Sequence, residues 1–172
     1  MEEIKVLIDE EKLNKRIKEV AEEISKDYKN EEIVLICILK GAAYFAIDLS
    51  KRITDSVVIL DFMKASSYGN SRESTKNVEL TIDLSTNIEN KNVIIVEDII
   101  DSGYTLNYLH DYLKNKNPKT LKICVLLDKK ERRKKEIKVD YTAFEVENKF
   151  IVGYGLDYED KYRNLPYVGY VE

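Results

Sequence analysis

The stretch that decides the fold reads Val93-Ile94-Ile95-Val96-Glu97-Asp98-Ile99-Ile100-Asp101-Ser102-Gly103-Tyr104-Thr105. Its four leading β-branched residues predict a strand buried on both faces, as in a parallel sheet. A helical pattern follows, with apolar residues at Leu106, Leu109 and Leu113. A strand, a short polar loop and a helix in this order indicate an α/β fold, in which ligands bind just beyond the carboxyl ends of the strands.

The loop between this strand and helix combines two kinds of chemistry. A Ser/Gly/Thr turn that opens a helix presents N–H groups, hydroxyls and the positive helix end to a phosphate. The carboxylates Glu97, Asp98 and Asp101 would repel a phosphate unless they bind sugar hydroxyls, a divalent cation or a proton. A ligand that carries a phosphate, a ribose and a metal fits best. The competing interpretation is an ordinary strand-to-helix turn with acidic caps.

The run from Val93 to Leu106 resembles the phosphoribosyl-pyrophosphate-binding motif of the purine phosphoribosyltransferases. The resemblance implies the type I phosphoribosyltransferase fold, which is a central, mostly parallel sheet flanked by helices, with a small base-binding cap (hood). It further implies roles for individual residues. Magnesium is the expected cofactor, Asp101 is the expected proton acceptor from the purine ring, and Tyr104 contributes only its backbone because the family varies there. The residues expected to hold the 5′-phosphate are Ser102, Gly103, Tyr104 and Thr105, and those expected to face the ribose hydroxyls and magnesium are Glu97 and Asp98.

Working outward, apolar runs alternate with helical patterns and predict a right-handed parallel α/β sheet. Asp9 is expected to cap a first helix, because Glu10 and Glu11 follow it and apolar residues recur at helical spacing. No repeat or linker interrupts the 172 residues, so we expect one domain over residues 1–172, with the cap formed from the chain ends. The expected strands are 6–8, 33–39, 57–63, 78–83, 93–96, 121–127, 141–146, 149–152 and 167–171, and a second helix is expected over 42–53.

Composition limits the class of protein. The chain is 44% hydrophobic and 35% charged, with a net charge of −4, so it has no general attraction to nucleic acid or acidic membranes. Cys37 and Cys124 lie in apolar runs and are expected to pack as buried hydrophobes. The sequence has neither a signal peptide nor an apolar span of membrane length, so we expect a cytoplasmic protein. His110 is the only histidine, which excludes chemistry built on histidine pairs.

Two further segments resemble loops of the same family. Leu39-Lys40-Gly41 follows a strand and resembles the pyrophosphate-binding loop, in which the peptide before the lysine is cis. The family usually has two glycines after the lysine, whereas this chain has Gly41-Ala42. We expect a polar, mobile loop over Lys64–Asn77, and within it the pair Ser67-Tyr68 resembles the catalytic lid that closes over the reaction centre and excludes water. Without the resemblance, these segments would be a plain turn and a surface connection.

The last two matching segments concern the purine. Lys129 opens the basic run Lys129–Lys135, and the resemblance implies that it donates to the 6-oxo oxygen of the base. The other charges of the run are expected on the surface. The segment 149–166 resembles the base pocket of the hypoxanthine-guanine branch. The resemblance implies that Phe150 stacks on the purine and that the backbone of Ile151 reads the base edge. It also implies that Asp157 reaches a second magnesium ion through water and that Arg163 meets pyrophosphate.

Taken together, the resemblance implies purine salvage. The chain would transfer the ribosyl phosphate of phosphoribosyl pyrophosphate to hypoxanthine or guanine, giving the nucleoside monophosphate and pyrophosphate, and would act as a homodimer or homotetramer. Two alternatives remain open at this point. A regulatory protein of the same fold could bind nucleotide or use the basic run to bind RNA, and a nucleotide-sensing subunit could lack turnover.

Overall fold

The computed structural model describes residues 3–68 and 77–171, and its elements alternate much as the sequence predicts. In chain order they are β1 (Ile4–Ile8), α1 (Glu10–Asp27), β2 (Glu32–Ile38), α2 (Ala43–Ser50), β3 (Val57–Tyr68), β4 (Asn77–Ile82), β5 (Asn92–Ile100), α3 (Tyr104–Lys114), β6 (Thr120–Asp128), the 3₁₀ turn η1 (Lys130–Arg132), β7 (Tyr141–Glu145), β8 (Phe150–Val152) and β9 (Val168–Val171).

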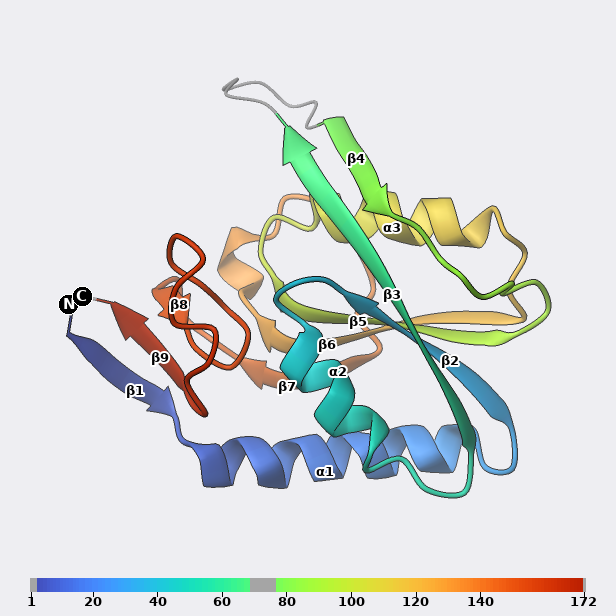
Figure 1. Ribbon diagram of the computed structural model, residues 1–172, viewed down its shortest axis with the longest axis horizontal. Coiled ribbons are helices and arrows are strands. Elements are labelled where there is room, and N and C mark those ends of the chain that lie inside the picture. The colour runs from blue at the N-terminus through green and yellow to red at the C-terminus, as the bar shows by residue number, and fades with distance from the viewer. Residues whose placement is uncertain (1–2, 69–76, 172) are drawn as a thin grey trace.

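The larger sheet has six strands in the order β4-β3-β2-β5-β6-β7, with every neighbour parallel except the edge strand β4. Strand β5 lies in its middle. Its side chains alternate between two cores: Ile94 and Val96 pack on the α1 and α2 face, whereas Val93 and Ile95 pack on the α3 face (Figure 1). The prediction of a mostly parallel sheet flanked by helices is therefore confirmed. Because β5 is an inner strand, the β5–α3 turn lies near the middle of the sheet, at the carboxyl ends of its parallel strands.

The smaller sheet joins the two ends of the chain. Its order is β1-β9-β8, and all of its pairs are antiparallel. Figure 1 shows it beside the carboxyl ends of the parallel strands, with both termini at its outer side. Helix α1 leaves β1 through Asp9, whose carboxylate accepts the Lys12 N–H at 2.8 Å, as the capping pattern predicts. Among the described helices, none is both long and apolar enough to cross a membrane.

One segment differs from the sequence prediction. Residues 64–68 continue β3 instead of starting a loop, and they pair antiparallel with β4, for example Ser66 with Glu79. A polar segment can extend a strand here because pairing with β4 satisfies the backbone hydrogen bonds of the extension. Ser67 and Tyr68 are placed here by backbone register only, and residues 69–76 of the expected lid lie outside the described residues.

Candidate active site

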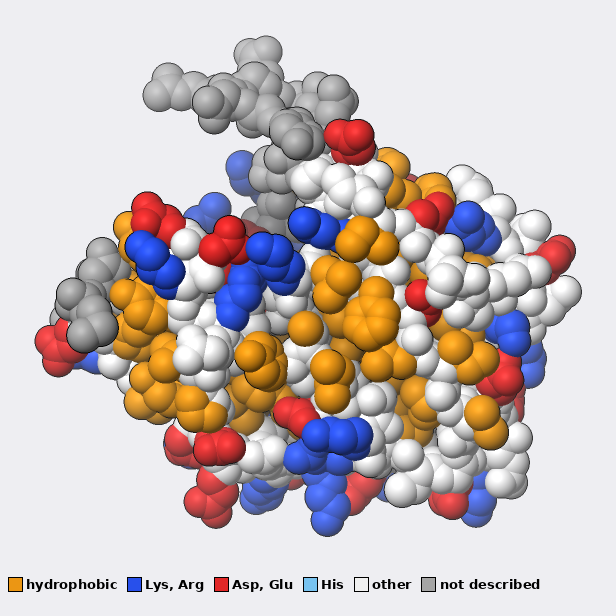
Figure 2. Space-filling model, viewed as in Figure 1, with side chains coloured by type: hydrophobic (Ala, Val, Ile, Leu, Met, Phe, Trp, Pro, Cys, Tyr) orange, Lys and Arg blue, Asp and Glu red, His pale blue; other side chains and the backbone are white. Residues whose placement is uncertain are grey.

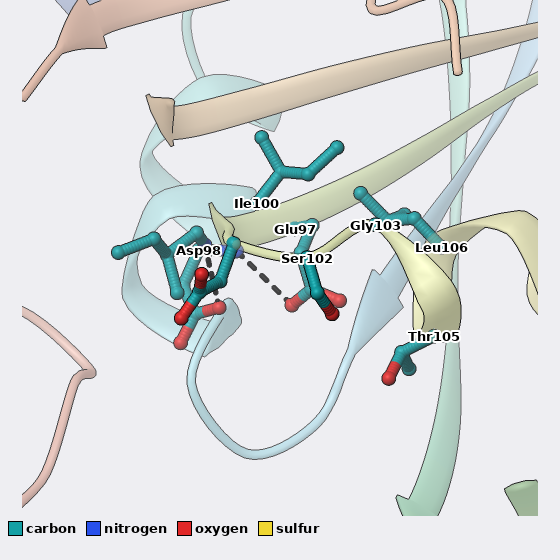
Figure 3. A pocket seen from close by; sticks show the side chains of 9 residues that line it. Glu97, Asp98, Ile100, Ser102, Gly103, Thr105 and Leu106 are labelled. Carbon is teal, nitrogen blue, oxygen red and sulfur yellow. Dashed lines mark hydrogen bonds between the residues drawn. The ribbon is translucent and has the colours of Figure 1, made fainter. Parts of the chain in front are cut away.

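The turn between β5 and α3 forms a pocket of about 240 Å³ at the carboxyl edge of the sheet (Figure 3). Gly103 stands at the helix N-cap with φ of 86°, a conformation that residues with side chains rarely adopt. A Cβ there would also lie 3.2 Å from the Arg133 Cδ and the Lys135 carbonyl. The first N–H groups of a helix have no partner within it, so this turn can donate to an anion. The pocket is lined by Glu97, Asp98, Ile99, Ile100, Asp101, Ser102, Gly103, Thr105 and Leu106.

Glu97 is buried and Asp98 is half-buried within the last residues of β5. The Glu97 side chain accepts the Asp98 N–H at 3.1 Å, and the Asp98 carboxylate accepts the Ile99 N–H at 2.6 Å. Burial raises the pKa of Glu97 well above its usual range, and the neighbouring Asp98 charge raises it further. Burial also raises the pKa of Asp98. Among the described residues, no ion pair reaches either carboxylate, so the pair suits a ligand that brings hydroxyl groups or a cation.

The turn after β2 lies directly against Asp98. Its Leu39-Lys40 peptide is cis, as the resemblance implies. A Cβ on Gly41 would overlap the Asp98 carboxylate, and a Cβ on Gly155 would overlap the Gly41 carbonyl oxygen. The Gly41 backbone is therefore enclosed between the Asp98 carboxylate and the Gly155 turn, where only glycines fit. The Lys40 Nζ reaches outward and lies 3.0 Å from the Asp160 Oδ1.

A second pocket of about 240 Å³ adjoins the first through Asp98 and Asp101. Lys129 is 9% exposed there and donates from Nζ to the Lys149 carbonyl at 2.7 Å, and burial lowers its pKa. Phe150 is 52% exposed, and its ring makes an edge-to-face contact with Tyr158, with centroids 5.2 Å apart. This pocket combines a flat apolar ring with one cationic donor. It is lined by Asp98, Ile99, Asp101, Lys129, Phe150, Ile151, Leu156 and Asp157.

Arg163 holds the segment beside this pocket together. Its guanidinium lies 2.8 Å from the Asp157 Oδ1 and 3.2 Å from the Asp160 Oδ1, and it donates to the Gly155 carbonyl at 2.7 Å. The second Asp157 oxygen accepts the Asp160 N–H at 2.8 Å. Both carboxylate oxygens of Asp157 therefore have partners within the chain.

The basic run after β6 supports the β5–α3 turn. The Arg133 guanidinium lies 2.6 Å from the buried Asp128 carboxylate, and the N–H groups of Lys134 and Lys135 both donate to the Ser102 carbonyl at 3.0 Å. The expectation that these charges lie on the surface is wrong for Arg133, whose side chain is 18% exposed. A run of charged residues usually indicates a solvated loop. The feature that could have predicted a half-buried arginine here is Asp128, an acidic residue at the end of an apolar strand that needs a cationic partner.

Asp101 joins the two pockets and has a neighbour that the sequence analysis missed. The Arg132 Nε lies 2.8 Å from the Asp101 Oδ1, close enough for an ion pair but not aligned for a hydrogen bond. The structure thus brings together the predicted residues of β5, the β2 turn, the β6 end and the segment after β8. Ser67 and Tyr68 are the exception, because only their backbone is described.

Comparisons with known proteins agree with this geometry. A family profile described as "Phosphoribosyl transferase domain" matches residues 5–159. The hypoxanthine-guanine phosphoribosyltransferase of Bacillus subtilis (strain 168) is 48% identical over 165 residues, covering 96% of this chain and 91% of the relative. The hypoxanthine phosphoribosyltransferase of Buchnera aphidicola is 50% identical over 170 residues, covering 98% and 96%.

Solved structures give the same result. A crystal structure of a hypoxanthine-guanine phosphoribosyltransferase from Bacillus anthracis has a TM-score of 0.95 and 51% identity, covering 99% of this chain and 100% of that one. A structure from a study of the C-terminal region, oligomeric state and enzymatic activity of Trypanosoma cruzi hypoxanthine phosphoribosyltransferase has a TM-score of 0.93 and 40% identity, covering 98% and 91%.

Proposed function

The chain belongs to the phosphoribosyltransferase family, and we propose that it is a purine salvage enzyme that acts on 6-oxopurines. It transfers the ribosyl phosphate of phosphoribosyl pyrophosphate to hypoxanthine and guanine, forms the nucleoside monophosphate and releases pyrophosphate. The observation that carries this proposal is the pair of adjoining pockets. One has the chemistry of a phosphate site and the other that of a purine site, and the two share Asp98 and Asp101.

The first pocket is the proposed site of the phosphoribosyl group. The backbone of Ser102, Gly103 and Tyr104, with the Thr105 hydroxyl, binds the 5′-phosphate at the start of α3. Glu97 and Asp98 accept hydrogen bonds from the ribose hydroxyls, which removes part of the cost of burying two unpaired carboxylates. The pyrophosphate group extends towards the turn formed by Leu39, Lys40 and Gly41 and towards Arg163.

Magnesium is the proposed cofactor, and the residues present fit it. The ion is commonly bound by one or two carboxylates together with substrate phosphates. Glu97 and Asp98 supply such carboxylates, and Asp157 lies at the neighbouring pocket. No cluster of three or more potential ligands forms within the described part of the chain, which agrees with a site that the substrate completes. When bound, the ion neutralises charge on the leaving pyrophosphate.

The second pocket is the proposed base site, covered by the small β1-β9-β8 sheet, which we interpret as the cap of a single domain over residues 1–172. Phe150 stacks on the purine, and the Ile151 backbone contacts the base edge. Lys129 is a donor-only cation and suits the carbonyl oxygen at the purine 6-position. Asp101, between the pockets, accepts the proton that the ring nitrogen loses as it bonds to the ribose.

Catalysis in this arrangement consists of positioning and electrostatics. The transition state resembles a ribosyl cation, so the carboxylates beside the sugar stabilise it. Ser67 and Tyr68 are the proposed catalytic lid residues that exclude water from this cation, and β3 carries them to the edge of the sheet. RNA binding by the basic run has less support than the sequence suggested, because Lys129 is buried and Arg133 is paired with Asp128.

The test of the proposed function is release of pyrophosphate from phosphoribosyl pyrophosphate and magnesium. Release should require hypoxanthine or guanine and should be matched by an equal amount of nucleoside monophosphate. Release without a base, or none with any 6-oxopurine, would contradict the proposal.

We also propose that the protein acts as a homodimer or homotetramer. Tyr44 and Ile47 of α2 are 46% and 43% exposed, and Figure 2 shows apolar side chains gathered on the face where this helix lies. Large apolar side chains that gather on an exposed face often mark a protein–protein contact, so a second copy is a fitting cover. Light scattering should give at least a dimer, and Ile47→Lys should shift it towards the monomer. A monomeric wild-type protein at high concentration would contradict this assembly.

A further inference from the structure

The turn after β8 has an unusual backbone and an unusual anchor. Gly153, Tyr154 and Gly155 all have positive φ, at 92°, 48° and 102°. A tyrosine in this region of backbone space is uncommon and needs support from its surroundings. The Tyr154 side chain is 7% exposed, and its hydroxyl donates to the Asp48 Oδ2 of α2 at 2.6 Å. The anchor therefore joins two elements that are 106 residues apart.

This anchor lies next to the turn that carries the proposed pyrophosphate site. Gly155 directly follows Tyr154, and it packs so closely on the Gly41 carbonyl that no Cβ fits between them. Helix α2, which carries Asp48, begins at Ala43, two residues after Gly41. The hydrogen bond between Tyr154 and Asp48 thus closes a ring that runs through α2, the Gly41 turn and the Gly155 turn.

The acceptor in this hydrogen bond is an ionised carboxylate. Burial alone would raise the pKa of Asp48, but hydrogen bonds from Lys51 and Tyr154 outweigh it and lower that pKa. The Lys51 Nζ lies 2.8 Å from the other Asp48 oxygen. Burial, together with Asp48, raises the pKa of Tyr154, so the phenol keeps its proton and remains a donor. Hydrogen bonds to charged acceptors are stronger than neutral ones.

We propose that Tyr154 and Asp48 are positioning residues for phosphoribosyl pyrophosphate. Their hydrogen bond fixes the spacing between the Gly155 turn and the Lys40-Gly41 turn, and this spacing sets the shape of the slot for the pyrophosphate group. Neither residue lines either pocket, so both act through the backbone of Gly41. The inference rests on the proposed function, since it assigns a role at the same site.

The base site is held by strand pairing that does not involve Tyr154, so the proposed role of Tyr154 is specific to the pyrophosphate end of the site. Strand β8, which contains Phe150 and Ile151, pairs with β9 through Ile151 and Tyr170 among others. Loss of the Tyr154 anchor should therefore affect the pyrophosphate end of the site and leave the base end in place. A loss of binding that is equal in the ground state and in the transition state raises KM and leaves kcat nearly unchanged.

Tyr154→Phe is the test, and Tyr141→Phe is its matched control. Tyr141 is also buried, and it donates to Asp27, which pairs with Lys122 as Asp48 pairs with Lys51. Tyr154→Phe should raise the KM for phosphoribosyl pyrophosphate about tenfold, because part of the binding free energy must then restore the spacing that the hydrogen bond holds in the wild type. The KM for hypoxanthine and kcat should change much less, and Tyr141→Phe should leave all three constants close to the wild type.

A second pair of variants approaches the bond from its other end. Asp48→Asn keeps an acceptor oxygen and should keep most of the affinity, whereas Asp48→Ala should behave like Tyr154→Phe. Calorimetric binding of phosphoribosyl pyrophosphate with magnesium measures this without turnover, so a wild type that binds but does not react refutes only the proposed function. Equal affinity in Asp48→Ala and wild type, or equal effects of the two tyrosine variants, would overturn the positioning role.

Discussion

Two pairs of carboxylates at opposite ends of the central sheet have opposite surroundings. At the amino end, Glu31 lies 2.8 Å from the Lys119 Nζ and Asp27 lies 2.9 Å from the Lys122 Nζ, and the pKa of each acid is lowered. At the carboxyl end, Glu97 is buried and Asp98 is half-buried, neither forms an ion pair with another described residue, and burial raises the pKa of both. The two acids at the amino end have charged partners within the chain, whereas we propose that a ligand supplies the partners of Glu97 and Asp98.

This contrast predicts where substitutions change activity and where they change stability. Carboxylates at the carboxyl end should matter for turnover, and those at the amino end should matter for folding. A variant at the carboxyl end can therefore be compared with a variant of the same residue type at the amino end. Alternatively, the same variant can be compared with two bases or with different magnesium concentrations.

The largest effect is expected for Asp101→Asn. The amide keeps the shape of the side chain but cannot accept the purine proton, so kcat should fall about 10²–10⁴-fold. Binding of phosphoribosyl pyrophosphate should change much less. Steady-state kinetics against Asp27→Asn, which removes a charge at the amino end, supplies the control. Near wild-type turnover in Asp101→Asn would remove Asp101 from its proposed role.

The next largest effect concerns the choice of base at Lys129. Adenine presents an amino group where hypoxanthine has a carbonyl, so a buried cationic donor would face another donor. Adenine should be poorer by at least about 10²-fold in kcat/KM, because an unpaired buried charge loses more than the roughly 1.5–3 kcal/mol of one charge-assisted hydrogen bond. Competition assays should show this ratio shrinking in Lys129→Ala. An unchanged ratio would mean that another group reads the 6-position.

A smaller effect is expected for the magnesium requirement. Chelation should abolish activity, and added magnesium should restore it. Asp157→Ala should raise the magnesium concentration for half-maximal activity by about tenfold, as losses around a metal site often do. Asp157 is bound to Arg163 in the free protein, so the substrate must share or displace that contact. Superimposable magnesium titrations of variant and wild type would show that Asp157 has no link to the metal.

The sequence predicted the elements and the place of the site because both depend on local pattern. Runs of β-branched residues predict strands, and the motif around Asp101 and Ser102 places the pocket at one strand end. It did not predict the extension of β3 to Tyr68, because polar residues look like a loop until an edge partner pairs with them. Nor did it predict the Arg133–Asp128 or Tyr154–Asp48 pairs, since the first lies within a charge run and the second depends on how distant segments fold together.

The smallest expected effect tests the contrast directly, through Glu97→Gln and Glu31→Gln. The folded protein raises the pKa of Glu97, so it holds that proton more tightly than the unfolded chain does. Ionising Glu97 therefore destabilises the free protein as the pH rises above the ordinary carboxyl range of about 4. Glu97→Gln should raise Tm at neutral pH by roughly 2–4 °C, the shift that about 1 kcal/mol gives in a domain of this size.

Glu31→Gln should have the opposite sign. The folded protein lowers the pKa of Glu31, chiefly through the Lys119 hydrogen bond, so its charge stabilises the fold at neutral pH, and this contribution is lost as the pH falls through the lowered pKa. The variant should therefore lower Tm at neutral pH, and both differences from the wild type should shrink towards acid pH. Bound phosphoribosyl pyrophosphate and magnesium should remove the rise in Tm of Glu97→Gln. The ligand then interacts favourably with the ionised Glu97 carboxylate, which is unfavourable in the free protein. Melting curves of the three proteins against pH, with and without ligand, measure all of these shifts in Tm. A lower Tm for Glu97→Gln than for the wild type at neutral pH would show that the charge of Glu97, like that of Glu31, stabilises the free protein.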